Sequence, residues 1–309
     1  MPKITIIGAG AVGATAAQRI AQMELGDVVM TDIVEGLPQG KALDLAQAGP
    51  LCGYDSKVTG TNEYKDIESS DVVVVTAGIA RKPGMTRDDL LKINGKITRE
   101  VSQNIAKYAP DSIVITVTNP LDIMTYVALK TIGFEPRRVF GMSGVLDSGR
   151  FATFIAMELG CSVRDISAMV LGGHGDTMVP LPRFTTVSGI PITELMSKDT
   201  IERLVERTVN GGAEIVNLLK TGSAFYAPSA AVTNMVEAVL KDTKRVMAVC
   251  AYLSGEYGKR DIYLGVPVKL GKRGIEEIME LELTADEKRS LDRSAEAVRS
   301  GISSLKAIQ

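Results

Sequence analysis

Several residue types are scarce in this sequence of 309 residues, which has no tryptophan, one histidine and three cysteines. Cys52, Cys161 and Cys250 are far apart and form no CxxC pair, so the spacing excludes the usual zinc and disulfide motifs. We therefore expect three buried thiols in a reducing compartment, and no metal. Because imidazole titrates near neutrality without a shifted pKa, proton transfer by histidine would depend on His174.

The sequence also lacks a charge excess and a long apolar run. Its 35 Lys and Arg residues are nearly balanced by 37 Asp and Glu residues, and no basic cluster suited to nucleic acid stands out. No apolar run approaches the ~20 residues of a membrane span, and no charged-then-apolar leader precedes the first expected strand. We expect a cytoplasmic protein without nucleic-acid or membrane partners.

A glycine-rich turn joins the first expected strand, residues 3–7, to a helical stretch at residues 14–23. In this context the pattern GxGxxG is typical of dinucleotide binding. Its first glycine permits a tight turn, its second lets a pyrophosphate approach the backbone, and its third lets the helix pack on the strand. The candidate cofactor-binding residues here are Gly8, Ala9, Gly10, Ala11, Val12 and Gly13.

Asp32 follows the next apolar run, about 20 residues after the glycine-rich turn, which is the spacing of a carboxylate that binds the adenosine ribose hydroxyls. A carboxylate at that place repels a 2′-phosphate, so the pattern favours NAD over NADP. A glycine-rich turn without a ligand is the alternative.

Short β-branched runs alternate with helical stretches through the first half of the chain. Such nearly continuous apolar runs are typical of strands that are covered on both faces of a parallel sheet. We predict an α/β fold with a Rossmann doubly wound parallel sheet, forming an NAD-binding domain at residues 1–145. Further strands are expected at residues 57–59, 71–76, 112–117 and 138–140, and helices at residues 90–108 and 121–132.

The pattern changes near residue 145, and we predict an α+β catalytic domain at residues 146–309. Its last helix should begin at Thr284, which forms a capping-box pattern with Glu287. One apolar stripe of that helix should face a core, and it comprises Leu291, Ala295, Val298, Ile302 and Leu305. Other helices are expected at residues 147–159 and 200–219, and strands at residues 166–171, 245–253 and 262–270.

Three polar residues of this second domain are candidates for chemistry. His174 lies between glycines that leave room for a substrate beside the imidazole. Asp147 and Arg150 are three residues apart on an expected helix, so they share one face. They form either a surface ion pair of little energetic value or a functional pair. In the second case Asp147 accepts the Nδ1 proton of His174 and Arg150 binds a substrate carboxylate.

Four motifs, in this order and spacing, resemble the lactate/malate dehydrogenase family over the whole chain. They are residues 8–13, residues 117–120 (Val-Thr-Asn-Pro), residues 147–150 (Asp-Ser-Gly-Arg) and residues 172–176 (Gly-Gly-His-Gly-Asp). The resemblance implies NAD as the cofactor and hydride transfer to or from a 2-hydroxy acid. It makes His174 the catalytic acid/base, Asp147 its partner and Arg150 the residue that binds a substrate carboxylate.

The resemblance also implies roles around the cofactor. By position, Asn119 binds both the nicotinamide side of the cofactor and the substrate oxygen, while Asn94, Val117 and Thr118 contact the cofactor. In the family, the segment at residues 79–87 is a mobile loop that closes over the substrate.

Two arginines of that loop bear on the reaction and its specificity. Arg87 aligns with the arginine that polarises the substrate carbonyl, and Arg81 aligns with the residue that faces the substituent on the reacting carbon. Lactate enzymes typically carry glutamine at the second position and malate enzymes carry arginine. The expected substrates are therefore the dicarboxylic acids malate and oxaloacetate. The alternative interpretation is that Arg81 is one of several solvated charges on a loop and does not select the substrate.

The motifs look closer to the lactate-type branch of the malate dehydrogenases than to the dimeric branch. This implies a homotetramer rather than a dimer, and a reaction of the tricarboxylic acid cycle. Two rival hypotheses stay open, because a fold alone does not establish chemistry. The chain could prefer lactate or a bulkier 2-hydroxy acid, or it could be a non-catalytic NAD-binding structural protein.

Overall fold

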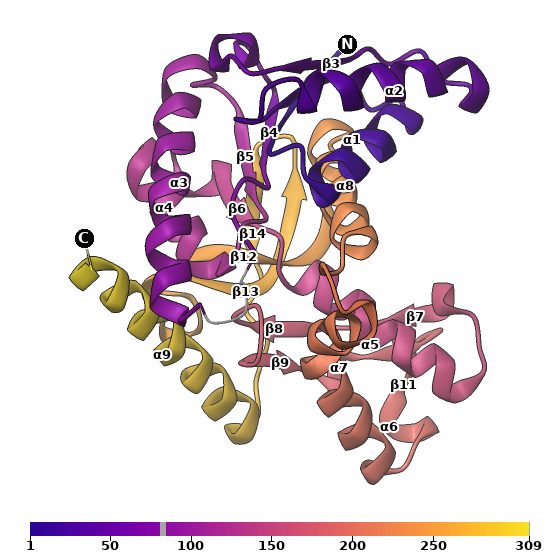
Figure 1. Cartoon of the computed structure of the whole chain (residues 1–309). Coiled ribbons are helices and arrows are strands. Elements are labelled where there is room, and N and C mark those ends of the chain that lie inside the picture. Colours follow the sequence, from indigo (N-terminus) through magenta and orange to yellow (C-terminus); the bar gives the residue numbers. More distant parts are fainter. Residues whose placement is uncertain (81–84, 309) are drawn as a thin grey trace.

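The computed structural model describes residues 1–80 and 85–308. In the first half of the chain, parallel strands pair in the order β3-β2-β1-β4-β5-β6. Figure 1 shows α3 and α4 on one side of these strands and α1 on the other, which buries their β-branched side chains. This is the predicted doubly wound sheet. Its elements are β1 (Lys3–Ile7), α1 (Ala11–Gln22), β2 (Asp27–Thr31), α2 (Leu37–Cys52), β3 (Val58–Thr61), η1 (Tyr64–Ile67), β4 (Val72–Val75), α3 (Arg87–Tyr108), β5 (Ile113–Thr116), α4 (Leu121–Ile132), η2 (Pro136–Arg138) and β6 (Val139–Gly141).

The second half of the chain extends the same sheet with antiparallel strands. Cys250 of β12 pairs with Gly141 of β6, and β13, β8 and β9 follow in order, with β14 paired to β13. Within the described residues, β7, β10 and β11 form a separate small sheet. The elements are α5 (Gly144–Leu159), η3 (Val163–Asp165), β7 (Ile166–Ser167), β8 (Val170–Gly172), β9 (Met178–Pro180), η4 (Pro182–Phe184), β10 (Thr186–Val187), β11 (Ile190–Pro191), α6 (Ile192–Leu195), α7 (Lys198–Leu219), α8 (Tyr226–Leu240), β12 (Arg245–Ser254), η5 (Glu256–Gly258), β13 (Arg260–Gly271), β14 (Gly274–Ile278) and α9 (Ala285–Ile308).

The last helix, α9, begins as its sequence predicts. Thr284 N–H donates to Glu287 Oε2 at 2.8 Å, and Glu287 N–H donates to Thr284 Oγ1 at 3.3 Å, which completes the capping box. The stripe from Leu291 to Leu305 is buried. Figure 1 shows α9 beside α3 at the lower left of the molecule.

One predicted strand is wrong. Residues 166–171 do not form a single strand, because β7 pairs with β10 in the small sheet while β8 pairs with β13 and β9 in the large one. Between them, Met169 N–H donates to Thr185 Oγ1 at 3.3 Å and takes no part in a ladder. The apolar run therefore crosses from one sheet to another, which its composition does not reveal.

The prediction of three buried cysteines is wrong for two of them. Cys52 is exposed and Cys161 is partly exposed, while Cys250 is buried. Cys52 is the last residue of α2, and Cys161 follows the final turn of α5. Side chains at helix ends have fewer neighbours than those on a central strand such as β12.

Residues 145 and 146, between which the sequence predicts a domain boundary, both lie in the first turn of α5. The exact division into domains stays a prediction. In the part of the chain that the structure describes, no helix has both the length and the apolar character required to cross a bilayer.

Candidate active site

A cavity of about 300 Å³ lies at the carboxyl ends of the first four strands. Ligands of doubly wound sheets bind at this edge. Its lining comes from the ends of β1 to β4 and from one face of α3, and includes Gly8, Gly10, Asp32, Asn62, Tyr64, Ala77 and Ile97.

The three glycines of the turn are present for different structural reasons. Gly8 has a φ of +108°, and a Cβ there would lie 2.7 Å from Ala77 N. A Cβ on Gly13 would lie 1.9 Å from Gly8 O, so only glycine lets α1 pack this closely on β1. Gly10 has no atom within 4 Å of an added Cβ. The space beside Gly10 is therefore open to a ligand, and no packing contact requires a glycine at this position.

The N-terminus of α1 faces this cavity without a cap. Gly10 is its N-cap residue, and among the described residues no side chain accepts a capping hydrogen bond from the N–H groups of the first turn. Ala11 is exposed and Val12 is partly exposed in that turn, whereas Ala9 is fully buried. Free N–H groups at a helix N-terminus form an anion-binding site.

Asp32 is held in place by the main chain. Its Oδ2 accepts from Ala9 N–H at 2.7 Å and its Oδ1 accepts from Val34 N–H at 3.0 Å. Asp32 is partly exposed and lines the cavity beside Val34. The carboxylate therefore has a fixed orientation and free lone pairs for two vicinal hydroxyls.

Tyr64, which our sequence analysis missed, lines the cavity together with Glu100. Burial, with smaller contributions from the charges of Glu100 and Asp32, raises the pKa of Tyr64 to about 12. The phenol is therefore neutral at physiological pH. Nothing in its short helical segment η1 marked it as a cavity residue.

Asn94 is fully buried and links three segments that border the cleft. Its amide oxygen accepts from Ile79 N–H at 2.9 Å, and its amide nitrogen donates to Asn119 O at 2.7 Å. Val117 and Thr118 are buried, and Thr118 Oγ1 donates to Ala77 O at 2.7 Å. Asn119 is exposed.

His174, Asp147 and Arg150 are in direct contact. Asp147 projects from the first turn of α5, and His174 lies in the turn between β8 and β9. His174 Nδ1 is 2.9 Å from Asp147 Oδ2, and Arg150 Nη1 donates to Asp147 Oδ1 at 3.3 Å. The Asp147 side chain is 2% exposed, whereas His174 and Arg150 are 12% and 13% exposed. The buried carboxylate thus holds an imidazole and a guanidinium that are both partly accessible.

Burial lowers the pKa of His174, but the charge and hydrogen bond of Asp147 and the charge of Asp122 outweigh burial and the repulsion from Arg150. The pKa of His174 is therefore raised above its ordinary value. Because Asp147 occupies Nδ1, Nε2 is the atom through which His174 can exchange a proton. An imidazole held in this way by a carboxylate is suited to general acid/base chemistry.

Arg150 has an unused hydrogen-bond donor. Its Nε is buried without a hydrogen-bond partner among the described residues. Gly212 of α7 lies beside the guanidinium, where an added Cβ would be 3.6 Å from Nη2. A buried donor without an acceptor is costly, so this guanidinium is suited to an incoming carboxylate.

Asp122, in the first turn of α4, is a second buried carboxylate that the sequence analysis missed. Its Oδ2 accepts from His174 N–H at 2.9 Å, and its Oδ1 accepts from the Cys250 thiol at 3.3 Å. Burial raises the pKa of Asp122 despite these hydrogen bonds. Its signal was available: it is the one acidic residue of a largely apolar helix, two residues after Pro120 of the Val-Thr-Asn-Pro motif.

The structure describes only one of the two loop arginines. Arg81 lies outside the described residues. Arg87 is exposed in the first turn of α3, where Thr86 and Asp89 form a capping box. Within residues 1–80 and 85–308, no group of three His, Cys, Asp or Glu side chains is arranged to hold a metal ion.

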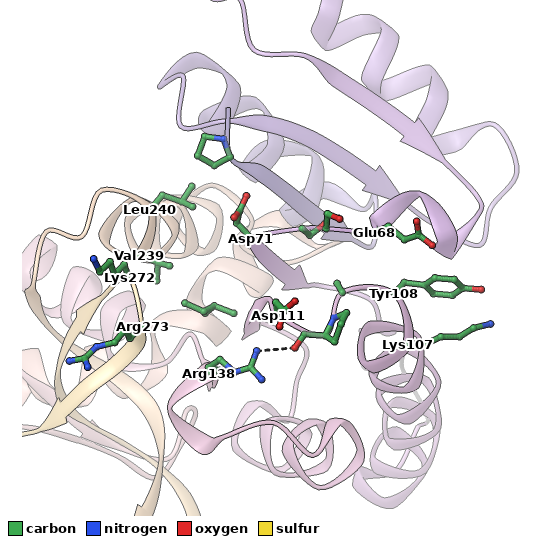
Figure 2. Close-up of a pocket in the computed structure, with 16 residues that line it drawn as sticks. Glu68, Asp71, Lys107, Tyr108, Asp111, Arg138, Val239, Leu240, Lys272 and Arg273 are labelled. Carbon is green, nitrogen blue, oxygen red and sulfur yellow. Dashed lines mark hydrogen bonds between the residues drawn. The ribbon is translucent and has the colours of Figure 1, made fainter.

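A larger cavity, of about 720 Å³, lies at the opposite edge of the sheet (Figure 2). Pro2, Asp71, Asp111 and Arg138 line it, and each stands directly before or close to the start of a strand. Figure 2 shows Arg138 bonded to the main chain, and its Nη1 donates to Pro110 O at 2.9 Å. The volume of a cavity therefore does not identify the ligand site, because ligands of doubly wound sheets bind at the carboxyl ends of the strands, where the smaller cavity lies.

Comparison with known proteins agrees with this geometry. Residues 2–141 match the family model of the lactate/malate dehydrogenase NAD binding domain, and residues 144–309 match that of the alpha/beta C-terminal domain. A malate dehydrogenase of Methanosarcina barkeri is 67% identical over 305 residues, 99% of each chain. The malate dehydrogenase structure from Salinibacter ruber is 52% identical with a TM-score of 0.95, covering 99% of this chain and 98% of that one.

A lactate dehydrogenase from Cryptosporidium parvum, solved with lactic acid and nicotinamide adenine dinucleotide, is 43% identical with a TM-score of 0.96. It covers 99% of this chain and 98% of that chain. Together with the glycine-rich turn and the contact between His174 and Asp147, these matches show that the chain belongs to the lactate/malate dehydrogenase family.

Proposed function

We propose that this protein catalyses (S)-malate + NAD⁺ ⇌ oxaloacetate + NADH + H⁺. The observation that carries the proposal is the contact of His174 and Arg150 with one buried carboxylate, Asp147. This contact places an acid/base beside a guanidinium whose Nε–H has no acceptor among the described residues. The names of the relatives favour malate over lactate, since the relative from Methanosarcina barkeri is a malate dehydrogenase at 67% identity.

The residues of the cleft fit NAD. The uncapped N-terminus of α1 suits the pyrophosphate, the open side of Gly10 admits it, and the fixed Asp32 carboxylate suits two ribose hydroxyls. When bound, the nicotinamide ring supplies the site that accepts or returns the hydride.

The side chains of the site transfer the proton and bind and orient the substrate. In malate oxidation, neutral His174 accepts the hydroxyl proton at Nε2, and the charge of Asp147 stabilises the imidazolium that results. Arg150 binds the carboxylate next to the reacting carbon through two parallel N–H groups. Asn119 orients the substrate oxygen. In oxaloacetate reduction, protonated His174 returns the proton to the same oxygen.

Arg81 and Arg87 are assigned roles from their positions in the sequence. Arg87 polarises the substrate carbonyl in the transition state. Arg81 pairs with the second carboxylate of the dicarboxylic acid, which a lactate substrate does not have.

We expect the wild-type protein to oxidise NADH with oxaloacetate at a kcat/KM at least ~10³ times that with pyruvate. The measurement is the loss of NADH absorbance in parallel initial-rate assays, with 2-ketoisocaproate as a third substrate. A higher kcat/KM with pyruvate or 2-ketoisocaproate would assign the site to another 2-hydroxy acid. NADH binding without oxidation of any substrate would favour a structural role.

Replacing Asp147 by Asn should lower kcat for oxaloacetate reduction by about 10²-fold. The variant loses the negative charge that raises the pKa of His174, so this pKa should fall. Reduction requires protonated His174, and its rate therefore declines as pH rises through that pKa. We expect the decline to begin at a lower pH in the variant, as measured by pH–rate profiles. Asp165→Asn, at an exposed position, is the matched control, and a profile that does not move in Asp147→Asn would refute this role.

A homotetramer and a cytoplasmic location also belong to this proposal. Large apolar side chains are exposed on α2 and α7, including Leu51 and Leu218 at 87% and 75%, and such surfaces favour contacts between copies. Sedimentation velocity distinguishes a tetramer from a dimer.

A further inference from the structure

Lys41 of α2 reaches the glycine-rich turn from outside the motif. Its Nζ donates to Ala9 O at 2.6 Å, and the side chain is partly buried. The main chain of Ala9 is thus held at both ends by opposite charges, because its N–H donates to Asp32 Oδ2 at 2.7 Å. The Lys41 ammonium donates to a carbonyl oxygen rather than to a carboxylate, so this contact is not an ion pair.

The carbonyl that Lys41 contacts belongs to the peptide group whose N–H is that of Gly10. Gly10 lines the cofactor cavity, and its N–H has no acceptor among residues 1–80 and 85–308. Hydrogen bonds in a chain polarise one another. An ammonium on the carbonyl side therefore makes the N–H on the other side a stronger donor to an anion.

The contact also restricts the turn. Gly10 has no Cβ, and an added Cβ would meet no atom within 4 Å, so no side-chain packing at this residue restricts its conformation. The hydrogen bond from Lys41 supplies the restraint that a side chain at Gly10 would otherwise provide. A peptide group that is already oriented loses less entropy when it binds a ligand.

We propose that Lys41 is a positioning residue for the pyrophosphate of the dinucleotide, acting through the peptide group between Ala9 and Gly10. The inference rests on the NAD binding in the proposed function and goes beyond the glycine-rich motif. Lys41 strengthens and orients one N–H donor at the start of α1. Its effect is therefore specific to ligands that carry the diphosphate group.

The test compares ligands with and without phosphate. NADH binding is followed by the fluorescence of NADH itself, and ADP-ribose and adenosine are measured by displacement of NADH. For Lys41→Met we expect the Kd values of NADH and ADP-ribose to rise about tenfold, since hydrogen bonds to charged groups contribute at this level. The Kd of adenosine should stay within about twofold. Lys41→Arg should retain most of the affinity because it keeps a cationic donor.

Lys57→Met is the matched control, because Lys57 is exposed on the same domain and its loss changes the net charge equally. We expect it to leave all three Kd values unchanged. Unchanged binding of ADP-ribose by Lys41→Met would overturn the proposal. An equal loss for adenosine and ADP-ribose would also overturn it, since that result indicates a general distortion of the domain. Neither result bears on oxaloacetate reduction by the wild-type protein, which tests the proposed function separately.

Discussion

Replacing His174 by Asn lowers kcat for oxaloacetate reduction by about 10⁴-fold and leaves the Kd for NADH within about twofold of the wild type. Asn can form a hydrogen bond to the ketone oxygen, but it has no proton to transfer near neutral pH. No other histidine exists in the chain to substitute for it. The fall is large because the imidazole both positions the oxygen and supplies its proton.

The two measurements are a stopped-flow or steady-state assay and a fluorescence titration with NADH. Since the chain has no tryptophan, the titration follows the cofactor's own emission. An unchanged thermal denaturation midpoint shows that the variant is folded. A kcat close to that of the wild type would remove His174 from the mechanism, whereas a parallel loss of NADH binding would point to a disturbed fold.

Replacing Arg81 by Gln raises the ratio of kcat/KM for pyruvate to kcat/KM for oxaloacetate by about 10³-fold or more. A guanidinium in a closed site needs an anion opposite it, so pyruvate, which has a methyl group there, leaves it unpaired. Glutamine removes that cost for pyruvate and also removes the partner of the second carboxylate of oxaloacetate. Both changes move the ratio in the same direction.

The control for Arg81→Gln is Lys82→Gln, which removes one positive charge from the neighbouring position in the sequence. We expect this control to leave the ratio within about threefold, because the proposal assigns the contact with the second carboxylate to Arg81 and not to Lys82. Equal effects of the two substitutions would mean that the net charge of the loop, rather than a specific contact by Arg81, selects the substrate.

The local elements could be predicted from sequence because their signals are local. The helix expected at residues 121–132 is α4 with the same bounds, and the capping box of Thr284 starts α9 as expected. The strand–glycine–helix pattern at the start of the chain is confirmed by the structure and by the match to an NAD binding domain. Each of these features depends on residues that lie within about 20 positions of one another in the sequence.

Contacts between distant segments were not accessible in the same way. The sequence suggested the pairing of His174 with Asp147 through resemblance to a family, whereas the structure brings the two side chains to 2.9 Å. It does so because α5 packs against β8. The run at residues 166–171 was misread because its two halves pair in different sheets.

The sequence by itself determined the parallel sheet, the nucleotide-binding turn, the acidic residue at the end of β2 and the identity of the one titratable imidazole. Periodicity, turn residues and spacing along the chain encode these features. Only the tertiary structure decided that Asp122 bonds the His174 main chain and that Lys41 bonds Ala9. Those contacts join residues 52 and 32 positions apart, and their partners are set by how helices pack across the sheet, which no local pattern records.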